Sequence, residues 1–216
     1  MYTAFSRVFQ NCKQNAVSTT QGTLNQTHAN WQTSMSNSVL IPYNKVPQYQ
    51  LATVLLVGSE GLGKHGFGKC LIKNTWFYLQ VRTATTLPLP VTSDSSRPRI
   101  DYICFLIDLT SRDSLKTVEE SLKHVDVRYF LGKCCFVALK VKNPEKRAIF
   151  IEQIAQLSQQ YKSDVLYGSF ETEAESAFLA EQILKSVEIA AGLQKNKSPM
   201  FLECCRFPVA GEESAE

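Results

Sequence analysis

The feature that most constrains the fold of this chain is a glycine-rich turn that directly follows an apolar run. Residues 51–57, Leu-Ala-Thr-Val-Leu-Leu-Val, carry no charge and predict a buried β-strand. The next residues, Gly58 to Lys64, match the spacing G-x-x-x-x-G-K of a phosphate-binding loop. In such a loop the glycines let backbone N–H groups face the phosphates, and the lysine reaches the outer phosphates. A strand, this turn and a helix in that order predict an α/β fold.

One position of the motif departs from a working nucleotide site. The residue after Lys64 should be Ser or Thr, whose hydroxyl holds Mg²⁺, but here it is His65. An imidazole does not replace a hydroxyl in the tight oxygen shell of Mg²⁺. We therefore interpret Gly58, Gly63, Lys64 and His65 as a degenerate phosphate-loop remnant, in which the glycines serve the turn and Lys64 is a solvated lysine. We expect no catalytic residue, no cofactor and no metal ligand, while weak anion binding at the helix start stays open.

After this turn, the sequence alternates between apolar runs and amphipathic segments. The apolar runs predict further strands at residues 76–83, 100–107, 133–141 and 164–167. Helical spacing of apolar residues predicts helices that begin near Leu62, Ser111, Asn143-Pro144 and Thr172. This alternation is typical of a parallel sheet wound by right-handed crossovers. The expected fold class is α/β, a small-GTPase-like (P-loop NTPase-like), mostly parallel sheet flanked by helices.

A working small GTPase needs further motifs, and the chain lacks them. Only a Pro/Ser-rich loop, residues 87–99, lies where D-x-x-G should stand, so the switch II region is predicted to be shortened or absent. The position of N-K-x-D reads Lys142-Asn143-Pro144-Glu145, without an aspartate for guanine. We therefore predict a catalytically inactive pseudo-GTPase. Two alternatives stay open: a divergent Rab/Ras-like small GTPase, and an adaptor that holds a nucleotide without hydrolysing it.

Composition divides the chain into three parts. Residues 1–38 are rich in Gln, Asn, Ser and Thr and contain no acidic residue, which predicts a disordered polar extension. Residues 39–195 form the predicted small-GTPase-like domain, and residues 196–216 form a tail with an apolar patch. No run reaches the roughly 18 apolar residues of a membrane span. The net charge of +3 is too small to indicate nucleic-acid binding.

Two apolar clusters lie outside the periodic core positions. Phe130 and Leu131 stand between a predicted helix and a predicted strand, where connecting loops are normally polar. Met200, Phe201 and Leu202 stand in the otherwise polar tail. Exposed aromatic and aliphatic groups of this kind anchor protein–protein interfaces, so these five residues are the candidates for partner binding.

Several segments, in the same order along the chain, resemble the centromere protein M family. They include Met35–Leu40 followed by Thr53–Gly58, and then Leu87-Pro88-Leu89-Pro90. The most specific block is residues 97–136, which opens with Arg-Pro-Arg-Ile-Asp and closes with Tyr-Phe-Leu-Gly-Lys-Cys-Cys-Phe. The similarity covers roughly residues 35–195. One departure is that this chain keeps Gly63-Lys64, which makes its phosphate loop less eroded than the resemblance implies.

The resemblance implies a small-GTPase-like fold that neither binds nor hydrolyses GTP. It implies a structural subunit of the inner kinetochore, held by centromere protein I together with centromere proteins H and K, and needed for chromosome segregation. Other inner-kinetochore subunits would be neighbours, centromeric chromatin would be contacted indirectly, and no membrane would be involved. The implied location is the nucleus, at the centromere and kinetochore of the chromosome.

Overall fold

A central sheet of five strands organises the fold. The structure, a computed structural model, describes residues 39–42, 50–89, 99–142 and 144–198. The strands are β1 (Leu51–Val57), β2 (Tyr78–Ala84), β3 (Tyr102–Asp108), β4 (Cys134–Leu139) and β5 (Asp164–Gly168). They are ordered β2-β1-β3-β4-β5, and every neighbouring pair is parallel. The predicted α/β class with a parallel sheet flanked by helices is confirmed.

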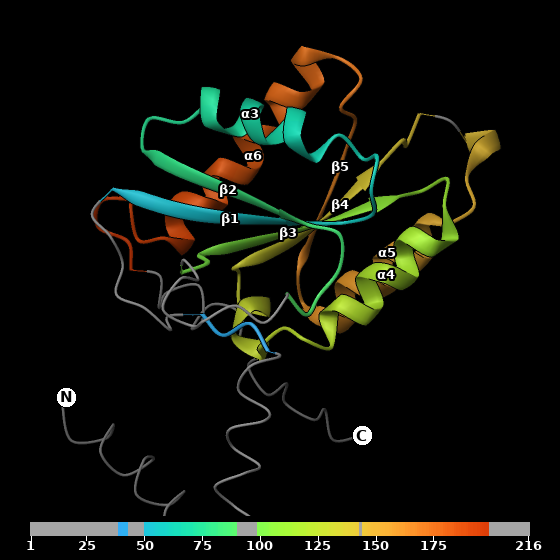
Figure 1. Ribbon diagram of the computed structural model, residues 1–216, viewed down its shortest axis with the longest axis horizontal. Coiled ribbons are helices and arrows are strands. Elements are labelled where there is room, and N and C mark those ends of the chain that lie inside the picture. Colours follow the sequence, from blue (N-terminus) through green and yellow to red (C-terminus); the bar gives the residue numbers. More distant parts are fainter. Residues whose placement is uncertain (1–38, 43–49, 90–98, 143, 199–216) are drawn as a thin grey trace, which may run out of the picture. The chain divides into compact units, whose positions relative to one another are not determined.

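Helices cover both faces of this sheet (Figure 1). One face carries α3 (Lys64–Lys73) and α6 (Glu173–Ala190), and the other carries α4 (Arg112–Leu122) and α5 (Ile151–Tyr161). Two apolar cores result, because successive side chains of each strand point to opposite faces. On β3, for example, Phe105 packs with the α4 and α5 side while Cys104 and Leu106 pack with the α3 and α6 side. None of the described helices is long and apolar enough to cross a membrane.

The strands differ in burial according to their place in the sheet. All residues of β3 and β4 are buried, as expected for parallel strands covered on both faces. The edge strands β2 and β5 are partly exposed. Cys104, Cys134 and Cys135 are buried and fill the core as small apolar residues. Burial raises the pKa of the Cys104 thiol, which favours its neutral form.

The segment after β4 corrects one predicted boundary. The helix expected to start at Asn143-Pro144 is instead a short 3₁₀ turn, η2 (Pro144–Lys146), and α5 begins only at Ile151. The reason is that the N–H groups of Ala148 and Ile149 both donate to the carbonyl of Leu109, which holds this stretch outside a helix. Phe150, which would lie within the predicted helix, is therefore an exposed residue just before α5.

The connection between β2 and β3 contains no helix in the part that the structure describes, residues 85–89 and 99–101. Leu87 and Leu89 pack into the core on the α4 side. The Leu87 N–H donates to the Ser121 hydroxyl at 3.1 Å, which fixes this connection against α4. Asp101 lies just before β3, where its carboxylate accepts hydrogen bonds from the Thr53 N–H at 2.9 Å and from Arg99 Nε at 2.6 Å. The Arg-Pro-Arg-Ile-Asp segment thus supplies Arg99 and Asp101 to the interior.

Candidate functional site

The phosphate-loop remnant lies at the carboxyl end of β1. In an open parallel sheet of this strand order, the crevice between the carboxyl ends of β1 and β3 is the usual ligand position. The backbone conformation and close packing of this turn require glycine at two positions. A Cβ at Gly58 would lie 2.7 Å from the Leu106 carbonyl oxygen, and Gly63 has a φ of +74°. Both glycines are therefore required by local geometry whether or not a ligand binds.

Lys64 is bound to the protein's own backbone. Its ammonium group donates to the carbonyl of Gly58, to the carbonyl of Ser59 at 3.1 Å and to the carbonyl of Ala84 at 3.2 Å. Burial lowers the pKa of Lys64, while the nearby Glu60 carboxylate opposes that shift. The prediction of a solvated lysine is wrong, because these three acceptors draw the side chain under the turn. The lysine thereby ties the end of β1 to the end of β2.

His65 lies in the first turn of α3 and is exposed. No group of three or more His, Cys, Asp or Glu side chains that could hold a metal ion occurs among the described residues. The acidic residue closest to this turn in sequence, Glu60, is exposed as well. The structure thus brings the four remnant residues to one turn without adding a ligand set around them.

Internal contacts bridge the loops that would surround a guanine base. Phe170, in the loop after β5, stacks on Phe67 of α3, with ring centroids 4.3 Å apart and ring planes 18° apart. Lys142 forms an ion pair with Glu175 in the first turn of α6, and Arg147 donates to the Val141 carbonyl. These contacts connect the loops after β4 and β5 to α3 and α6.

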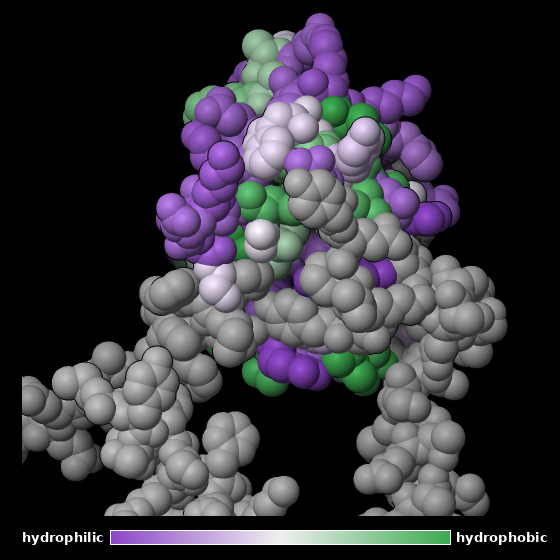
Figure 2. All heavy atoms as spheres, turned by 90° about the vertical axis from the view of Figure 1, so that its left-hand side faces the viewer, coloured by the Kyte–Doolittle hydropathy of each residue, from purple (hydrophilic) through white to green (hydrophobic). Residues whose placement is uncertain are grey.

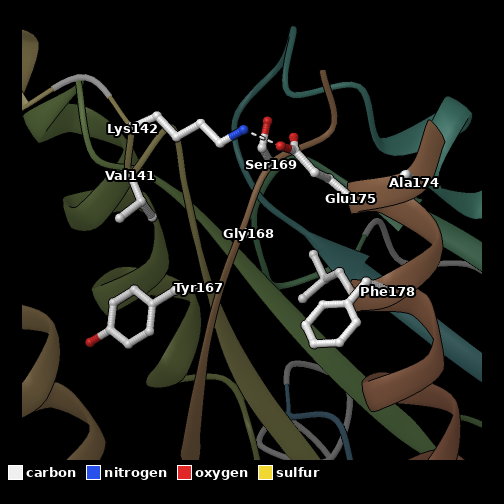
Figure 3. A pocket seen from close by; sticks show the side chains of 9 residues that line it. Val141, Lys142, Tyr167, Gly168, Ser169, Ala174, Glu175 and Phe178 are labelled. Atoms are coloured by element: carbon white, nitrogen blue, oxygen red, sulfur yellow. Dashed lines mark hydrogen bonds and ion pairs between the residues drawn. The ribbon is translucent and has the colours of Figure 1, made fainter. Parts of the chain in front are cut away.

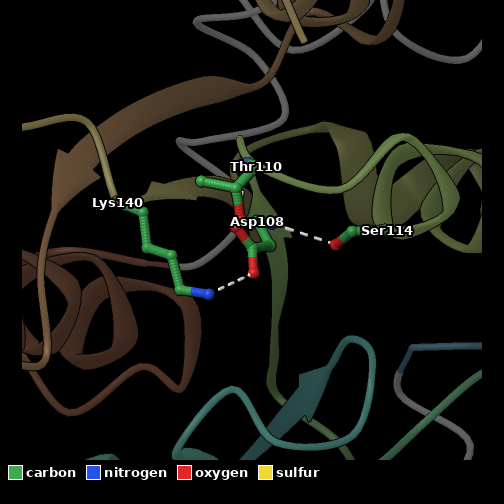
Figure 4. Close-up of polar contacts among 4 residues, drawn as sticks. All are labelled: Asp108, Thr110, Ser114 and Lys140. Atoms are coloured by element: carbon green, nitrogen blue, oxygen red, sulfur yellow. Dashed lines mark hydrogen bonds and ion pairs between the residues drawn. The ribbon is translucent and has the colours of Figure 1, made fainter. Parts of the chain in front are cut away.

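A polar cluster that the sequence analysis missed lies at the carboxyl end of β3 (Figure 4). The Asp108 carboxylate accepts hydrogen bonds from Thr110 N–H at 2.9 Å, Thr110 Oγ1 at 2.7 Å and Lys140 Nζ at 2.6 Å. The Asp108 N–H donates to the Ser114 hydroxyl at 2.9 Å. Burial disfavours the Asp108 carboxylate, but its hydrogen bonds to Lys140 and Thr110 outweigh that cost and lower its pKa. The cluster joins β3, β4 and α4.

The partner-binding candidates fall into three situations. Phe130 is half-buried and packs on Tyr161 at a centroid distance of 4.8 Å, so it belongs to the edge of the core. Leu131 is half-buried in the turn before β4. Met200, Phe201 and Leu202 lie outside the described residues. Leu131 therefore remains a candidate for an interface, whereas Phe130 is partly committed to the core.

Two exposed apolar residues near this turn were not found from the sequence. Val127 is 70% exposed at the start of the 3₁₀ turn η1 (Val127–Phe130), and Ile41 is 36% exposed. Backbone hydrogen bonds from the Leu40 N–H to the His124 carbonyl and from the Asp126 N–H to the Leu40 carbonyl hold the segment of Ile41 against the residues that lead into η1. We call Ile41, Val127 and Leu131 the amino-end face, because η1 and Leu131 precede β4 and the Leu40 contact joins Ile41 to the same segment. The sequence has no local signal for this tertiary contact.

The side of the molecule on which β1 and β2 begin mixes hydrophobic and hydrophilic surface (Figure 2). Trp76 and Tyr78, which flank the start of β2, are 66% and 73% exposed. Trp76 Nε1 donates to Glu188 of α6 at 2.7 Å, so this aromatic side chain is held in place by a polar contact. Neither residue was a candidate in the sequence analysis.

Comparison with known proteins decides the family. The family model for centromere protein M (CENP-M) matches residues 37–207. The chain is 38% identical over 156 residues to centromere protein M of Homo sapiens, which covers 72% of this chain and 86% of that protein. It is 33% identical over 162 residues to the protein of Xenopus laevis, with 74% and 90% covered. The Danio rerio protein is 32% identical over 157 residues, with 72% and 84% covered.

The chain belongs to the centromere protein M family. The region shared with the family includes the phosphate-loop remnant, the Asp108 cluster and the amino-end face. It also extends nine positions past Ser198, the last described residue, and so includes Met200, Phe201 and Leu202. Residues 1–36 lie outside the match.

Proposed function

We propose that this member of the centromere protein M family is a non-enzymatic, structural subunit of a centromeric protein assembly. In this proposal a small-GTPase-like fold has lost nucleotide binding and serves as a constant docking surface. Its partners would be centromere protein I, together with centromere proteins H and K, at the inner kinetochore in the nucleus. Loss of the subunit would then impair assembly of that subcomplex and chromosome segregation.

The position of Lys64 carries the pseudo-GTPase part of the proposal. In a loaded phosphate loop, this lysine points at the β- and γ-phosphates. Here three carbonyl oxygens accept from its ammonium group, which is the full donor capacity of a lysine. A phosphate would have to displace these acceptors and would find His65 in place of the Mg²⁺-binding hydroxyl.

Two further observations support the same proposal. The stack of Phe170 on Phe67 joins α3 to the loop after β5, one of the two loops that would surround a base. Glu145 stands in place of the guanine-binding aspartate, and it lies within the 3₁₀ turn η2. The core is meanwhile completed by apolar burial on both faces of the sheet, so stability does not depend on a nucleotide.

The docking part of the proposal rests on the amino-end face. Ile41 and Val127 are exposed and Leu131 is half-buried, at the end of the sheet opposite to the phosphate-loop remnant. Exposed aliphatic groups that gather in a patch are typical of interfaces. Phe130 supports this face from the core side, and Met200, Phe201 and Leu202 remain proposed anchors of the same interaction.

Nucleotide content tests the proposal against both alternatives. The purified full-length protein is denatured, its released nucleotides are separated by chromatography, and the native protein is titrated with fluorescent GDP and ATP, with and without Mg²⁺. We expect no stoichiometric nucleotide and no binding tighter than about 100 μM. Tight binding without turnover would favour the nucleotide-holding adaptor. Tight binding with Mg²⁺-dependent turnover would favour the divergent Rab/Ras-like GTPase.

A further inference from the structure

A second apolar site lies at the other end of the molecule, along the outer edge of β5. A groove of about 430 Å³ opens there (Figure 3). Its apolar lining comes from both faces of the sheet: Val141, Tyr167, Phe178 and Leu179, with Gly168 between them. In Figure 3, Val141 and Tyr167 stand on one side of β5 and Phe178 stands on the other. The groove therefore straddles the edge of a strand.

Among the described strands, none pairs with β5 at this outer edge. β5 is the last strand in the sheet order and pairs with β4 alone among the described strands. An edge strand presents alternate N–H and C=O groups that have no sheet partner, which is a template for another strand. β5 contains no Pro or Lys, two residue types that often protect such edges.

The side chains around this edge match the alternation of an added strand. Successive residues of an incoming strand would point to opposite faces, toward Tyr167 on one and toward Phe178 and Leu179 on the other. Tyr167 is 45% exposed and Phe178 is 64% exposed, so both can gain burial. A Cβ at Gly168 would lie 2.9 Å from Leu179 Cδ2, so α6 packs directly against the end of β5.

The charges at the carboxyl end of the groove favour an occupant with a basic residue there. Lys142 and Glu175 pair with each other across the groove (Figure 3). Glu171 is exposed, and its N–H donates to the hydroxyl of Ser169, a groove residue, at 3.1 Å. With Lys142 already paired, Glu171 leaves a negative charge at this end that a basic residue would complement.

We propose that this groove receives an extended segment of a partner polypeptide, which adds to β5 as a sixth strand. The segment carries aliphatic or aromatic residues at alternate positions and a Lys or Arg beside Glu171. Strand addition of this kind takes affinity from main-chain hydrogen bonds and specificity from side-chain pockets. The site is separate from the amino-end face, and the proposal does not depend on the proposed function.

The test uses the full chain and two defined probe peptides. They are acetyl-Thr-Val-Thr-Val-Thr-Val-Lys-amide and acetyl-Lys-Thr-Val-Thr-Val-Thr-Val-amide, which place the lysine at either end because strand direction is not fixed in advance. We expect one of them to bind saturably and to slow amide hydrogen exchange in β5. N-methylation of one alternate set of its amides should abolish binding, while N-methylation of the other set should preserve it.

Matched variants locate the site. Phe178→Glu should weaken peptide binding about 10-fold or more. Phe150→Glu, at an aromatic side chain of similar exposure on α5, should leave it unchanged. Failure of both peptides to saturate the wild-type protein by about 1 mM would overturn the proposal. Equal tolerance of both N-methylated sets would also overturn it, since a helix or a loose apolar contact needs no alternate N–H row. The N-methyl comparison uses only wild-type protein, so it stands even if a variant misfolds.

Discussion

The two ends of the sheet differ in how their side chains are used. At the carboxyl end, charged groups near the degenerate motif bind one another or the backbone: Lys64 binds carbonyls, and Asp108 binds Lys140. At the amino end, Ile41 and Val127 leave apolar side chains exposed, and Leu131 in the turn before β4 is half-buried. The degenerate motif thus lies where its charged groups are paired internally, whereas the amino-end face leaves apolar surface in a region without a sequence motif. A glycine-lysine pattern can therefore persist for reasons of packing.

The largest effect expected from this contrast is on stability at Gly58. Gly58→Ala would force a Cβ to within 2.7 Å of the Leu106 carbonyl oxygen and 2.9 Å of its Cβ. We expect a loss of about 3 kcal/mol in the free energy of unfolding, measured by urea denaturation. Gly66→Ala is the matched control, because a Cβ there meets nothing within 4 Å, and it should be neutral or stabilising by up to about 1 kcal/mol. If Gly58→Ala unfolds like the wild type, the turn is not held by packing.

The next effect should fall on binding rather than on stability. Leu131→Glu and Val127→Glu each place a charge in the amino-end face, and should weaken binding to the proposed partner, centromere protein I, by at least about 2 kcal/mol. Val127→Glu should melt within a few degrees of the wild type, since Val127 is 70% exposed. We expect the same of Leu131→Glu, because Leu131 is half-buried in a turn and is not one of the buried core residues. Phe150→Glu, also 70% exposed, is the control and should bind normally. A variant that melts normally and still binds would remove its residue from the docking face; if Leu131→Glu unfolds the lone chain, Leu131 is core.

A smaller effect should appear at Asp108. The pKa of Asp108 is lowered in the folded protein. Its contribution to the free energy of unfolding is therefore fully present above the unfolded pKa of about 3.9, and it is lost as the pH falls through the folded pKa. Asp108→Asn should cost about 1–2 kcal/mol of unfolding free energy at pH 7, and the difference from the wild type should shrink in acid. The control Asp113→Asn, at an almost fully exposed carboxylate, should change neither the unfolding free energy at pH 7 nor its dependence on acid pH. A constant difference across the acid range would contradict the assigned interaction with Lys140.

The smallest effect should come from restoring the motif. His65→Ser completes the G-x-x-x-x-G-K-S pattern, yet we expect no gain in GTP binding or hydrolysis. The reason is that Lys64 stays bound to carbonyls and that Phe170 still covers Phe67. Mg²⁺-dependent turnover by this single variant would mean that the phosphate-loop remnant still admits a nucleotide. It would contradict the proposed difference between the two ends of the sheet.

The sequence predicted the central strands well because their burial leaves an unbroken apolar signature. β1 matches its predicted span, and β3 and β4 lie within theirs apart from Asp108. Contacts between distant segments were not predictable in the same way. The Leu109 carbonyl accepts hydrogen bonds from two N–H groups in the segment before α5, so the helix begins later than predicted. No local sequence pattern encodes that pairing. The cluster at Asp108 also joins residues far apart in sequence, although an acidic residue that ends an apolar strand before Thr and Ser offered a partial signal.

The same limit applies to the candidate surfaces. Leu131 could be found from the sequence because an apolar residue in a connecting turn is unusual. Ile41 could not, because its place near the segment that leads into η1 depends on the bridge between Leu40 and Val125. Phe130 was a weaker inference from the same run, since its contact with Tyr161 places it at the edge of the core. Local composition can identify an unusual apolar residue, but tertiary contacts decide which face it occupies.

The carbonyl contacts of Lys64 have a consequence for the timing of assembly. A switch protein reports the ratio of two metabolites, because its shape follows whichever nucleotide is loaded. Here Lys64 binds carbonyl groups of its own main chain. These acceptors are part of the protein, so their availability does not change with the concentration of any metabolite. The docking surfaces would then be set at the moment of folding. Occupancy would follow the abundance of the subunits by simple mass action and be insensitive to the energy state of the cell.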